Sequence, residues 1–493
     1  MVCIFTNRKK IFEVKNYTDI IIVGAGLSGV GAACHLERKS PEKSYIIFEA
    51  REELGGTWSL FKYPGIRSDS DMYTFGFSFK TWDNPKSFAD APNILKYLNE
   101  AANEYKIKDK IRYKTKVLKA DFDNKNKLWS ITTINKSGNE ETYHSRFLFS
   151  CTGYYNYDEG YTPKYNGFEN FEGKIIHPQH WPENLDYKNK RVVVIGSGAT
   201  AVTIVPEMAD ETSEITMLQR SPTYVGAFPN NDKYAELFKK YFPKKIAHKL
   251  IRFKNIFVQI LFFHACKIWP NYMKKLLVKA AQKKLGDFPA KPHFEPNYKP
   301  WDQRFCVAPD GDLFRAIRKG KANVITDKID SFNKHGIKLA SGKNLDADII
   351  ISATGLKLLA FGGSKISVDN VPYNPSDAIT YKGLMLSGLP NCIFFAGYTN
   401  ASWTLKSDLT SEYASRLFKL MDKKNYSFFM PKVENQNMNI SPLLNLNSGY
   451  IHRSSHLFPK QGSKLPWKLY QNYFFDYTML RINKISDKNL ILN

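Results

Sequence analysis

The chain has 493 residues, of which 43% are hydrophobic and 14% aromatic, and its formal net charge is +24. This apolar content predicts a folded protein rather than a disordered one, and the length suits about two to four domains. There is no uninterrupted apolar run of about 18 residues, so we do not expect a membrane-spanning helix. The N-terminus lacks the apolar core of a signal peptide, and the six dispersed cysteines form no CxxC pair. Both features favour a reducing, cytoplasmic location.

The first strong signal is a strand, a glycine-rich turn and a helix in succession. Residues 20–23 are β-formers, and the turn Gly24-x-Gly26-x-x-Gly29 follows, leading into a helix of small residues. The first glycine allows the tight turn, the second lets backbone approach a pyrophosphate, and the third lets helix and strand pack closely. The next predicted strand ends in Glu49, whose carboxylate can accept hydrogen bonds from both hydroxyls of an adenosine ribose. This unit predicts a dinucleotide without a 2′-phosphate, such as FAD or NAD.

A second unit of the same kind has Gly196, Gly198 and Ala201 in the three turn positions. The strand after it ends in Arg220 instead of an acid. An arginine at this place pairs with a 2′-phosphate, which an acid would repel. The two units therefore predict two different dinucleotides, with NADP at the second. The alternative is that Arg220 is only a surface cation.

Two further segments, 147–153 and 348–355, each run from a predicted buried strand into a Thr-Gly pair. In this they resemble flavoproteins with two dinucleotide domains. That resemblance implies that the chain crosses between the FAD and NADPH domains at these strands, and that residues 393–398 return to the flavin. Taken alone, each segment also fits an ordinary turn from strand to loop.

Positive charge is concentrated in residues 232–291, where 15 lysines and arginines against three acids leave +12, half of the net charge. Apolar residues at helical spacing, such as Phe253, Phe257 and Leu261, predict a helical insertion with a basic outer face. We favour a solvated lysine face over an ordinary core, with a weak contact to an anionic membrane as the alternative. No nucleic-acid-binding signature accompanies the charge, so nucleic acid is not an expected partner.

The segment between the two glycine turns carries the pattern Phe171-x-Gly173-x-x-x-His177-x-x-x-Trp181-Pro. It resembles the fingerprint of type I Baeyer–Villiger monooxygenases. The resemblance implies that His177 and Trp181 act at a hinge that couples the two cofactor domains. A structural aromatic linker is the alternative. His177 and His180 lack a third ligand, so no metal is predicted.

The resemblance continues through Gly55-Gly56-Thr57-Trp58, Tyr63-Pro-Gly-Ile-Arg-Ser-Asp69 and Trp301-Asp-Gln-Arg304. From about residue 19 to about residue 467, the chain is similar to the ethionamide-activating branch of this family. The resemblance implies that Arg304 stabilises a negatively charged peroxyflavin and that Asp69 orients or tunes the arginine. On the residues alone, Arg304 could equally pair with Asp302 or Asp310. Gln303 stands where many family members have a lysine that contacts the 2′-phosphate; the ethionamide-activating branch shares this glutamine.

These features together predict an α/β fold with two Rossmann-like dinucleotide-binding domains and a helical insertion. We expect an FAD domain from 1–155 and 351–493, an NADPH domain from 156–225 and 296–350, and the insertion from 226–295. The catalytic residues implied are Arg304 and Asp69. The predicted cofactor-binding residues are Gly24, Gly26, Ser28, Gly29, Glu49, Gly56, Thr57, Trp58, Arg67, Ser68, Asp69, Tyr73 and Val117 in the first unit, and Gly196, Ser197, Gly198, Ala199, Thr200, Ala201, Gln219, Arg220 and Ser221 in the second.

The resemblance implies an FAD- and NADPH-dependent monooxygenase. It would use O2 to insert an oxygen atom beside the carbonyl of a ketone, or to oxygenate a sulfide or thioamide. Two alternatives stay open: a flavin N/S-monooxygenase without ketone oxidation, and a nucleotide-binding scaffold without turnover.

Overall fold

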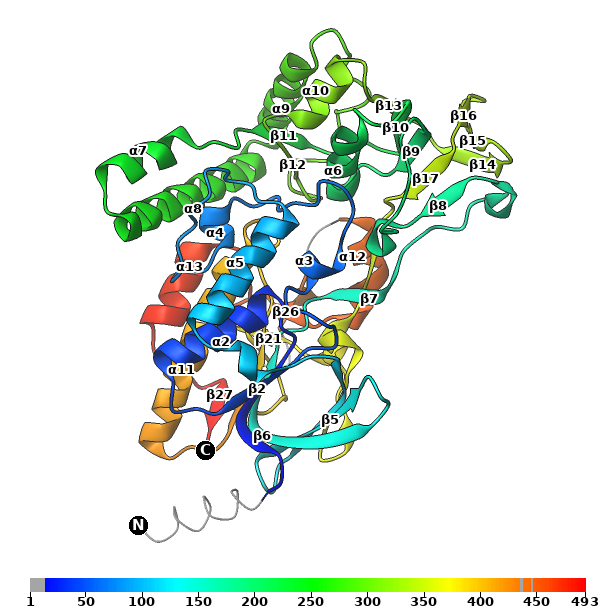
Figure 1. The fold of residues 1–493 in the computed structure, drawn as a ribbon. Coiled ribbons are helices and arrows are strands. Elements are labelled where there is room, and N and C mark those ends of the chain that lie inside the picture. Colours follow the sequence, from blue (N-terminus) through cyan, green and yellow to red (C-terminus); the bar gives the residue numbers. More distant parts are fainter. Residues whose placement is uncertain (1–13, 435–437, 445–446) are drawn as a thin grey trace.

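The computed structural model describes residues 14–434, 438–444 and 447–493, and two sheets organise it (Figure 1). In spatial order the strands of the first sheet are β20 (Val371–Pro372), β19 (Lys365–Val368), β4 (Thr115–Asp123), β5 (Leu128–Asn135), β6 (Glu140–Ser150), β1 (Tyr17–Val23), β2 (Tyr45–Phe48) and β3 (Ile111–Arg112), with β23 (Cys392–Phe394) also paired to β6.

The first predicted dinucleotide unit lies at the centre of this sheet. Strand β1 pairs in parallel with β2 and β6, and Ile20, Ile21 and Ile22 are completely buried. Such burial on both faces explains the unbroken run of β-formers. Helix α2 (Leu27–Lys39) follows β1 and packs against α11 (Trp403–Lys424) from the C-terminal part of the chain. Strand β23 joins β6 in parallel, so the expected late return of the chain to this domain is confirmed.

The second sheet is parallel throughout and holds the second predicted unit. Helices α6 (Ala199–Met208) and α10 (Asp312–Arg318) pack against each other beside it. The predicted α/β fold with two Rossmann-like units is confirmed. In spatial order its strands are β13 (Asn323–Thr326), β10 (Glu214–Gln219), β9 (Arg191–Ile195), β17 (Ile349–Ser352) and β8 (Lys174–Ile176).

Two antiparallel strands connect the sheets. Strand β7 (Tyr155–Gly160) continues from β6 after Gly153, and β18 (Leu356–Leu358) continues from β17 after Gly355. The two strands pair with each other between the sheets (Figure 1). The two Thr-Gly segments are therefore the places where the chain leaves one sheet for the other, as predicted.

The predicted helical insertion is confirmed: it consists of α7 (Lys233–Tyr241), α8 (Lys244–Ile268) and α9 (Pro270–Leu285). Helix α8 packs against α4 (Met72–Phe75) of the first domain. Beneath its exposed lysines the insertion has buried apolar residues, Ile251, Ile256, Ala281 and Leu285, so the expected lysine face over an ordinary core is present. Phe253, Phe257 and Leu261 are not part of this core. They are 59%, 46% and 53% exposed, because α8 turns a different face toward the protein.

The remaining elements complete the two domains. Near the C-terminus, β24 (Phe429–Pro431) pairs with β27 (Leu490–Leu492), so the chain ends on the side of the first sheet (Figure 1). The other helices are α3 (Thr57–Leu60), α5 (Ala91–Glu104), α12 (Gly449–Ser454) and α13 (Tyr473–Tyr477), and the other strands are β11 (Val225–Phe228), β12 (Cys306–Pro309), β14 (Ile329–Asn333), β15 (Gly336–Leu339), β16 (Asn344–Asp346), β21 (Thr380–Tyr381), β22 (Met385–Leu386), β24 (Phe429–Pro431), β25 (Ile440–Pro442), β26 (Lys460–Gly462) and β27 (Leu490–Leu492).

Within the described ranges, no helix is both long and apolar enough to cross a membrane. Cysteines 34, 151, 266, 306 and 392 are buried free thiols. Cys3 and most of the N-terminal stretch examined for a signal sequence lie outside the described residues.

Candidate active site

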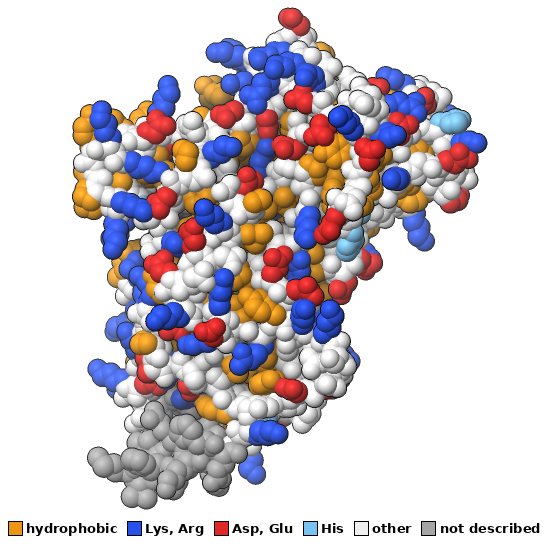
Figure 2. Space-filling model, in the orientation of Figure 1, with side chains coloured by type: hydrophobic (Ala, Val, Ile, Leu, Met, Phe, Trp, Pro, Cys, Tyr) orange, Lys and Arg blue, Asp and Glu red, His pale blue; other side chains and the backbone are white. Residues whose placement is uncertain are grey.

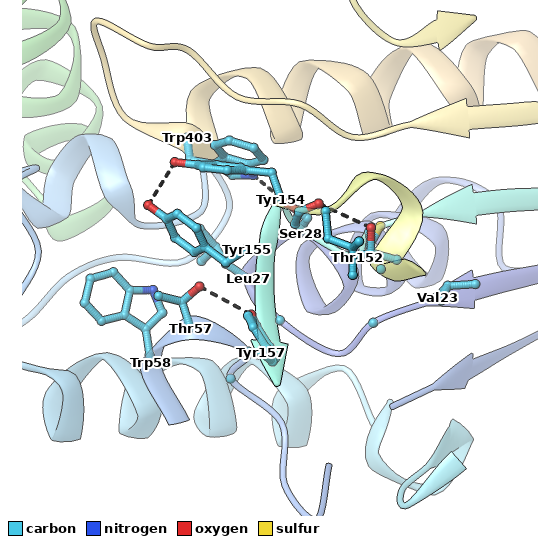
Figure 3. Close-up of a pocket in the computed structure, with 18 of the residues that line it drawn as sticks. Val23, Leu27, Ser28, Thr57, Trp58, Thr152, Tyr154, Tyr155, Tyr157 and Trp403 are labelled. Carbon is cyan, nitrogen blue, oxygen red and sulfur yellow. Dashed lines mark hydrogen bonds between the residues drawn. The ribbon is translucent and has the colours of Figure 1, made fainter. Parts of the chain in front are cut away.

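A cavity of about 570 Å³ lies where the two domains meet (Figure 3). Its wall includes the first glycine turn, the loop at 55–58 and the start of β7. Ala199, the first residue of α6, and Arg304 complete the wall from the side of the second domain. One cavity therefore joins the first dinucleotide turn, the second helix N-terminus and the predicted catalytic arginine.

The first turn has the geometry that a dinucleotide phosphate requires. Gly24 has φ +100°, and a Cβ there would lie 2.7 Å from the carbonyl oxygen of Cys151. At Gly29 a Cβ would lie 1.9 Å from the carbonyl oxygen of Gly24, so only glycine allows this close packing. Gly26 and Ser28 line the cavity, so the N-terminus of α2 faces it with its partial positive charge. These features fit the pyrophosphate of FAD.

Glu49 lies directly after β2, at the cavity wall. Its Oε2 accepts a hydrogen bond from the Ala25 N–H (2.8 Å) and its Oε1 accepts one from the Arg51 N–H (3.0 Å). Burial raises the pKa of Glu49, while these two hydrogen bonds oppose the shift. A carboxylate oxygen has more than one acceptor site, so Glu49 can still accept from ribose hydroxyls.

The second turn is more open. Gly196 has φ +141°, and a Cβ there would lie 2.4 Å from the carbonyl oxygen of Ala353, whereas a Cβ on Gly198 would meet no described atom within 4 Å. The open space over Gly198, at the start of α6, fits a pyrophosphate. The hydroxyl of Ser197 donates to the Ser221 carbonyl oxygen (2.9 Å) and so holds the turn against the loop after β10.

The strand-end residues of this unit differ in exposure. Arg220 is exposed, and it forms no ion pair with a carboxylate in the described part of the chain, so its charge is available to a 2′-phosphate. Gln219 is buried, and its amide nitrogen donates to the His293 carbonyl oxygen (2.7 Å) and to Thr326 Oγ1 (2.8 Å). Gln219 therefore supports the local fold. Thr200 and Ala201 belong to the first turn of α6, where Ala201 is buried.

Arg304 lies just before β12 and contacts a tyrosine of the first domain. Its Nη2 donates to the hydroxyl of Tyr154 at 2.8 Å. Asp302 instead pairs with Lys267 (3.0 Å), and Asp310 accepts from a backbone N–H, so the alternative of a plain ion pair with either acid is wrong. The guanidinium is always charged and lies at the cavity wall.

Asp69 lies at the same wall as Arg304. Burial raises the pKa of its carboxyl to about 6, while Arg304, Arg67 and the Val307 N–H oppose this shift. Arg67 forms an ion pair of 2.5 Å with Asp312 at the start of α10, and this pair ties the two domains together. The loop at 67–69 therefore positions an acid next to the cavity and holds the second domain.

The other predicted residues of the first unit divide into two groups. Gly56, Thr57, Trp58, Ser68 and Val117 line the cavity. Tyr73 does not line it; this residue is 1% exposed and belongs to the hydrophobic core of the first domain.

The fingerprint residues lie away from the cavity wall, at the connection between the domains. A Cβ on Gly173 would lie 2.4 Å from the ring of Phe171, so the glycine makes room for that buried ring. His177 Nε2 donates to the Gly355 carbonyl oxygen (3.0 Å), since its Nδ1 accepts from the Gln179 N–H (3.2 Å). Burial lowers the pKa of His177. Trp181 packs partly buried against the core of the second domain.

An aromatic group in the cavity has no counterpart in the sequence-based prediction. Tyr154 lies against Trp403 with ring centroids 5.2 Å apart, and its hydroxyl is 3.1 Å from that of Tyr155 (Figure 3). Trp403 Nε1 donates to Ser28 Oγ (2.8 Å), which fixes the indole over the start of α2. The hydroxyl of Tyr157 lies 3.4 Å from the hydroxyl of Thr57. The sequence signal that could have predicted this aromatic group is the pair Tyr154-Tyr155, which directly follows a Thr-Gly pair.

Comparison with known proteins identifies the family of the chain. Residues 17–362 match the family described as flavin-binding monooxygenase-like. The FAD-containing monooxygenase EthA of Mycolicibacterium smegmatis is 49% identical over 474 residues, which cover 96% of each chain. The chain belongs to the flavin-binding monooxygenase-like family. The probable FAD-binding monooxygenase AlmA of Acinetobacter baylyi is also similar, with 45% identity over 96% of each chain.

Two solved structures have folds similar to that of this chain. An open crystal structure of cyclohexanone monooxygenase matches with a TM-score of 0.75 at 17% identity, over 97% of this chain and 100% of that chain. An oxidized steroid monooxygenase bound to NADP matches with a TM-score of 0.73 at 18% identity, over 97% and 99%. The family and the fold together confirm the predicted class of protein.

Proposed function

We propose that this FAD- and NADPH-dependent monooxygenase inserts an oxygen atom from O2 beside the carbonyl of a ketone, or oxygenates a sulfide or thioamide. When bound, FAD and NADPH would supply the redox chemistry that activates O2, and the protein would hold and orient them. The observation that carries the proposal is that Arg304 and the first glycine turn share one cavity with the N-terminus of α6. The relatives called FAD-containing monooxygenases support an FAD-dependent monooxygenation.

Different residues of the chain bind FAD and NADPH. The N-termini of α2 and α6 bind the pyrophosphates of FAD and NADPH, since each helix follows a glycine turn that admits a phosphate. Glu49 accepts hydrogen bonds from the adenosine ribose of FAD, and Arg220 pairs with the 2′-phosphate of NADPH. The domain limits that follow are 1–155 and 351–493 for FAD, and 156–225 and 296–350 for NADPH.

Arg304 stabilises the negative charge that develops as oxygen is transferred, because a fixed cation aimed at developing charge acts without reorganisation. The Tyr154 hydroxyl holds the guanidinium in place. Asp69 adds a group of variable charge near the arginine, with a pKa of about 6. Tyr155, Tyr157 and Trp403 form an aromatic wall whose rings limit the access of water to the reacting atoms.

His177 acts as a positioning residue at the domain connection. Its hydrogen bond to Gly355 joins the fingerprint segment to one of the two crossings of the chain. Strands β7 and β18 connect the two domains, so any rotation of one domain against the other must bend these strands. His177 and Trp181 lie at this connection and are therefore placed to couple the two cofactor sites.

Oxygenation is tested with purified holoenzyme and a panel of linear, cyclic and aryl ketones and a thioether. NADPH oxidation is followed together with analysis of the esters, lactones and sulfoxides formed. We expect substrate-dependent NADPH oxidation with matching product. Sulfoxide without any ester or lactone would indicate the N/S-monooxygenase alternative, and no product from any compound would indicate a scaffold. The Arg304→Ala variant tests the role of Arg304 in this reaction. Its control is Arg112→Ala, which removes an exposed arginine of the first domain.

We also propose that the enzyme contacts an anionic membrane peripherally through its helical insertion. The net charge of +12 in residues 232–291 supports this contact, because anionic lipids attract basic segments.

A further inference from the structure

Helix α8 packs on the first domain through a face that combines apolar and polar side chains, since Ile251 and Ile256 are buried there. Its buried face carries His248 and Arg252, which are 5% and 7% exposed. Arg252 donates to the carbonyl oxygens of Tyr73 (2.8 Å) and Gly76 (2.6 Å), and it forms an ion pair of 3.1 Å with Asp408. Polar groups thus hold α8 on the first domain.

Two neighbouring amides on α8 also serve this attachment. Asn255 Nδ2 donates to Asp71 Oδ1 (2.8 Å), and Gln259 Nε2 donates to Asp71 Oδ2 (3.0 Å). Helix α8 therefore uses polar as well as apolar side chains on its inner face. In an ordinary surface helix the apolar residues lie on the inner face and the outer face is polar.

An apolar stripe runs along the outer face of α8, flanked by the exposed Lys245 and Lys249 and interrupted by the exposed His264. Ile246, Phe253, Phe257, Leu261 and Ile268 are spaced 7, 4, 4 and 7 residues apart, which places them on one side of the helix. They are 49%, 59%, 46%, 53% and 63% exposed. A helix of 25 residues is about 37 Å long, so this stripe is far longer than a chance surface cluster.

The neighbouring helices extend the apolar surface. Tyr234, Leu237 and Tyr241 on α7 are 65%, 50% and 66% exposed. Trp269, between α8 and α9, and Tyr272, on α9, are 61% and 65% exposed. Figure 2 shows hydrophobic side chains among lysines and arginines over the lobe at upper left, where α7 and α8 lie. Tryptophan and tyrosine suit the boundary between water and lipid, because their rings combine apolar area with a polar group.

Lysines border this surface. Lys245 and Lys249 on α8, and Lys275 and Lys279 on α9, are exposed. None of the four forms an ion pair with a carboxylate in the described ranges. Their charge is therefore free to interact with an external anionic surface.

We propose that the outer face of α7, α8 and α9 is a docking surface for a bilayer rich in anionic lipid, with α8 lying in the plane of the interface. An apolar face bordered by lysines is the pattern of helices that bind in this way. A second copy of the chain fits poorly, because a symmetric contact would bring two blocks of +12 together. The inference deepens the proposed membrane contact and does not depend on the oxygenation chemistry.

The test is sedimentation of the holoenzyme with vesicles of phosphatidylcholine alone and with added phosphatidylglycerol. We expect binding to the anionic vesicles that weakens as salt is raised. Phe257→Ser with Leu261→Ser should weaken this binding by roughly 100-fold, since each half-exposed side chain contributes about tenfold. Lys245→Gln with Lys249→Gln should weaken it by roughly 25-fold, at about fivefold per lysine.

Matched controls remove exposed apolar side chains, or exposed lysines, elsewhere on the molecule. Val371→Ser with Ile482→Ser removes two apolar side chains that are 66% and 64% exposed, and Lys125→Gln with Lys343→Gln removes two exposed lysines. Neither control should change vesicle binding. FAD content and NADPH oxidation in solution should stay unchanged in every variant, which separates failure of docking from failure of the enzyme.

Three results would overturn the proposal. The first is equal binding of wild-type protein to neutral and anionic vesicles, or binding to neither. The second is unchanged vesicle binding after loss of Phe257 and Leu261. The third is a wild-type dimer in analytical ultracentrifugation that the Phe257→Ser, Leu261→Ser variant abolishes, which would assign the face to a second copy.

Discussion

Replacing Asp69 by asparagine is expected to stabilise the protein increasingly as the pH rises. The pKa of Asp69 is raised from 3.8 to about 6, chiefly by burial. Between these values the folded chain binds more protons than the unfolded chain, so the free energy of unfolding falls as pH rises. A shift of about two units corresponds to at most about 3 kcal/mol, fully present above pH 6 and about half as large at pH 5. Asparagine has no such titration.

The assay is thermal unfolding of Asp69→Asn and wild-type protein stripped of FAD, from pH 5 to pH 8. We expect the variant to melt a few degrees higher at pH 8, with the difference shrinking toward pH 5. Asparagine Oδ1 can still accept from the Val307 N–H, so this contact is kept. A difference in Tm that is constant across this pH range, or one that favours wild type at pH 8, would show that Asp69 is not held in a site that disfavours its charge.

Three further substitutions probe the cofactor turns and the cavity. Gly29→Ala should abolish FAD incorporation, because its Cβ would lie 1.9 Å from a backbone oxygen; normal flavin content would contradict the packing. Arg220→Gln should raise KM for NADPH by about 10–100-fold while leaving KM for NADH unchanged, as loss of a charged hydrogen bond requires; parallel changes for both coenzymes would refute the 2′-phosphate role. Tyr154→Phe should lower kcat for oxygenation roughly tenfold with unchanged flavin content, because Arg304 loses its partner. An unaltered kcat would show that this contact does not position the arginine.

The two dinucleotide units could be predicted from sequence because local rules fix them. At Gly24 and Gly29 the backbone itself excludes a Cβ, and buried parallel strands need unbroken β-formers such as those of β1. The crossings of the chain at the two Thr-Gly segments were likewise predicted. Arg304 was identified by resemblance, and the structure brings it to the same cavity as the first turn.

Three features could not be predicted, since they depend on tertiary contacts. Periodicity detects an apolar stripe on α8 but not the side that it faces, and the carbonyl and carboxylate partners of Arg252 help to decide the orientation of the helix. The aromatic wall of the cavity joins Tyr154 to Trp403, which are far apart in sequence. Gln219 lies at a predicted strand end, yet its amide serves the local fold, because strand position alone does not tell which way a side chain points.

Isotope transfer shows whether Arg304 takes part in oxygenation by O2. Holoenzyme, NADPH and a ketone are incubated under 18O2, and the ester or lactone is analysed by mass spectrometry for wild type, Arg304→Ala and Arg112→Ala. We expect one 18O atom per product molecule for wild type and the Arg112 control. For Arg304→Ala we expect at least 100-fold less labelled product, with NADPH oxidation retained. Labelled product formed by Arg304→Ala at the wild-type rate would refute the role of Arg304, and wild-type product without 18O would refute oxygenation by O2.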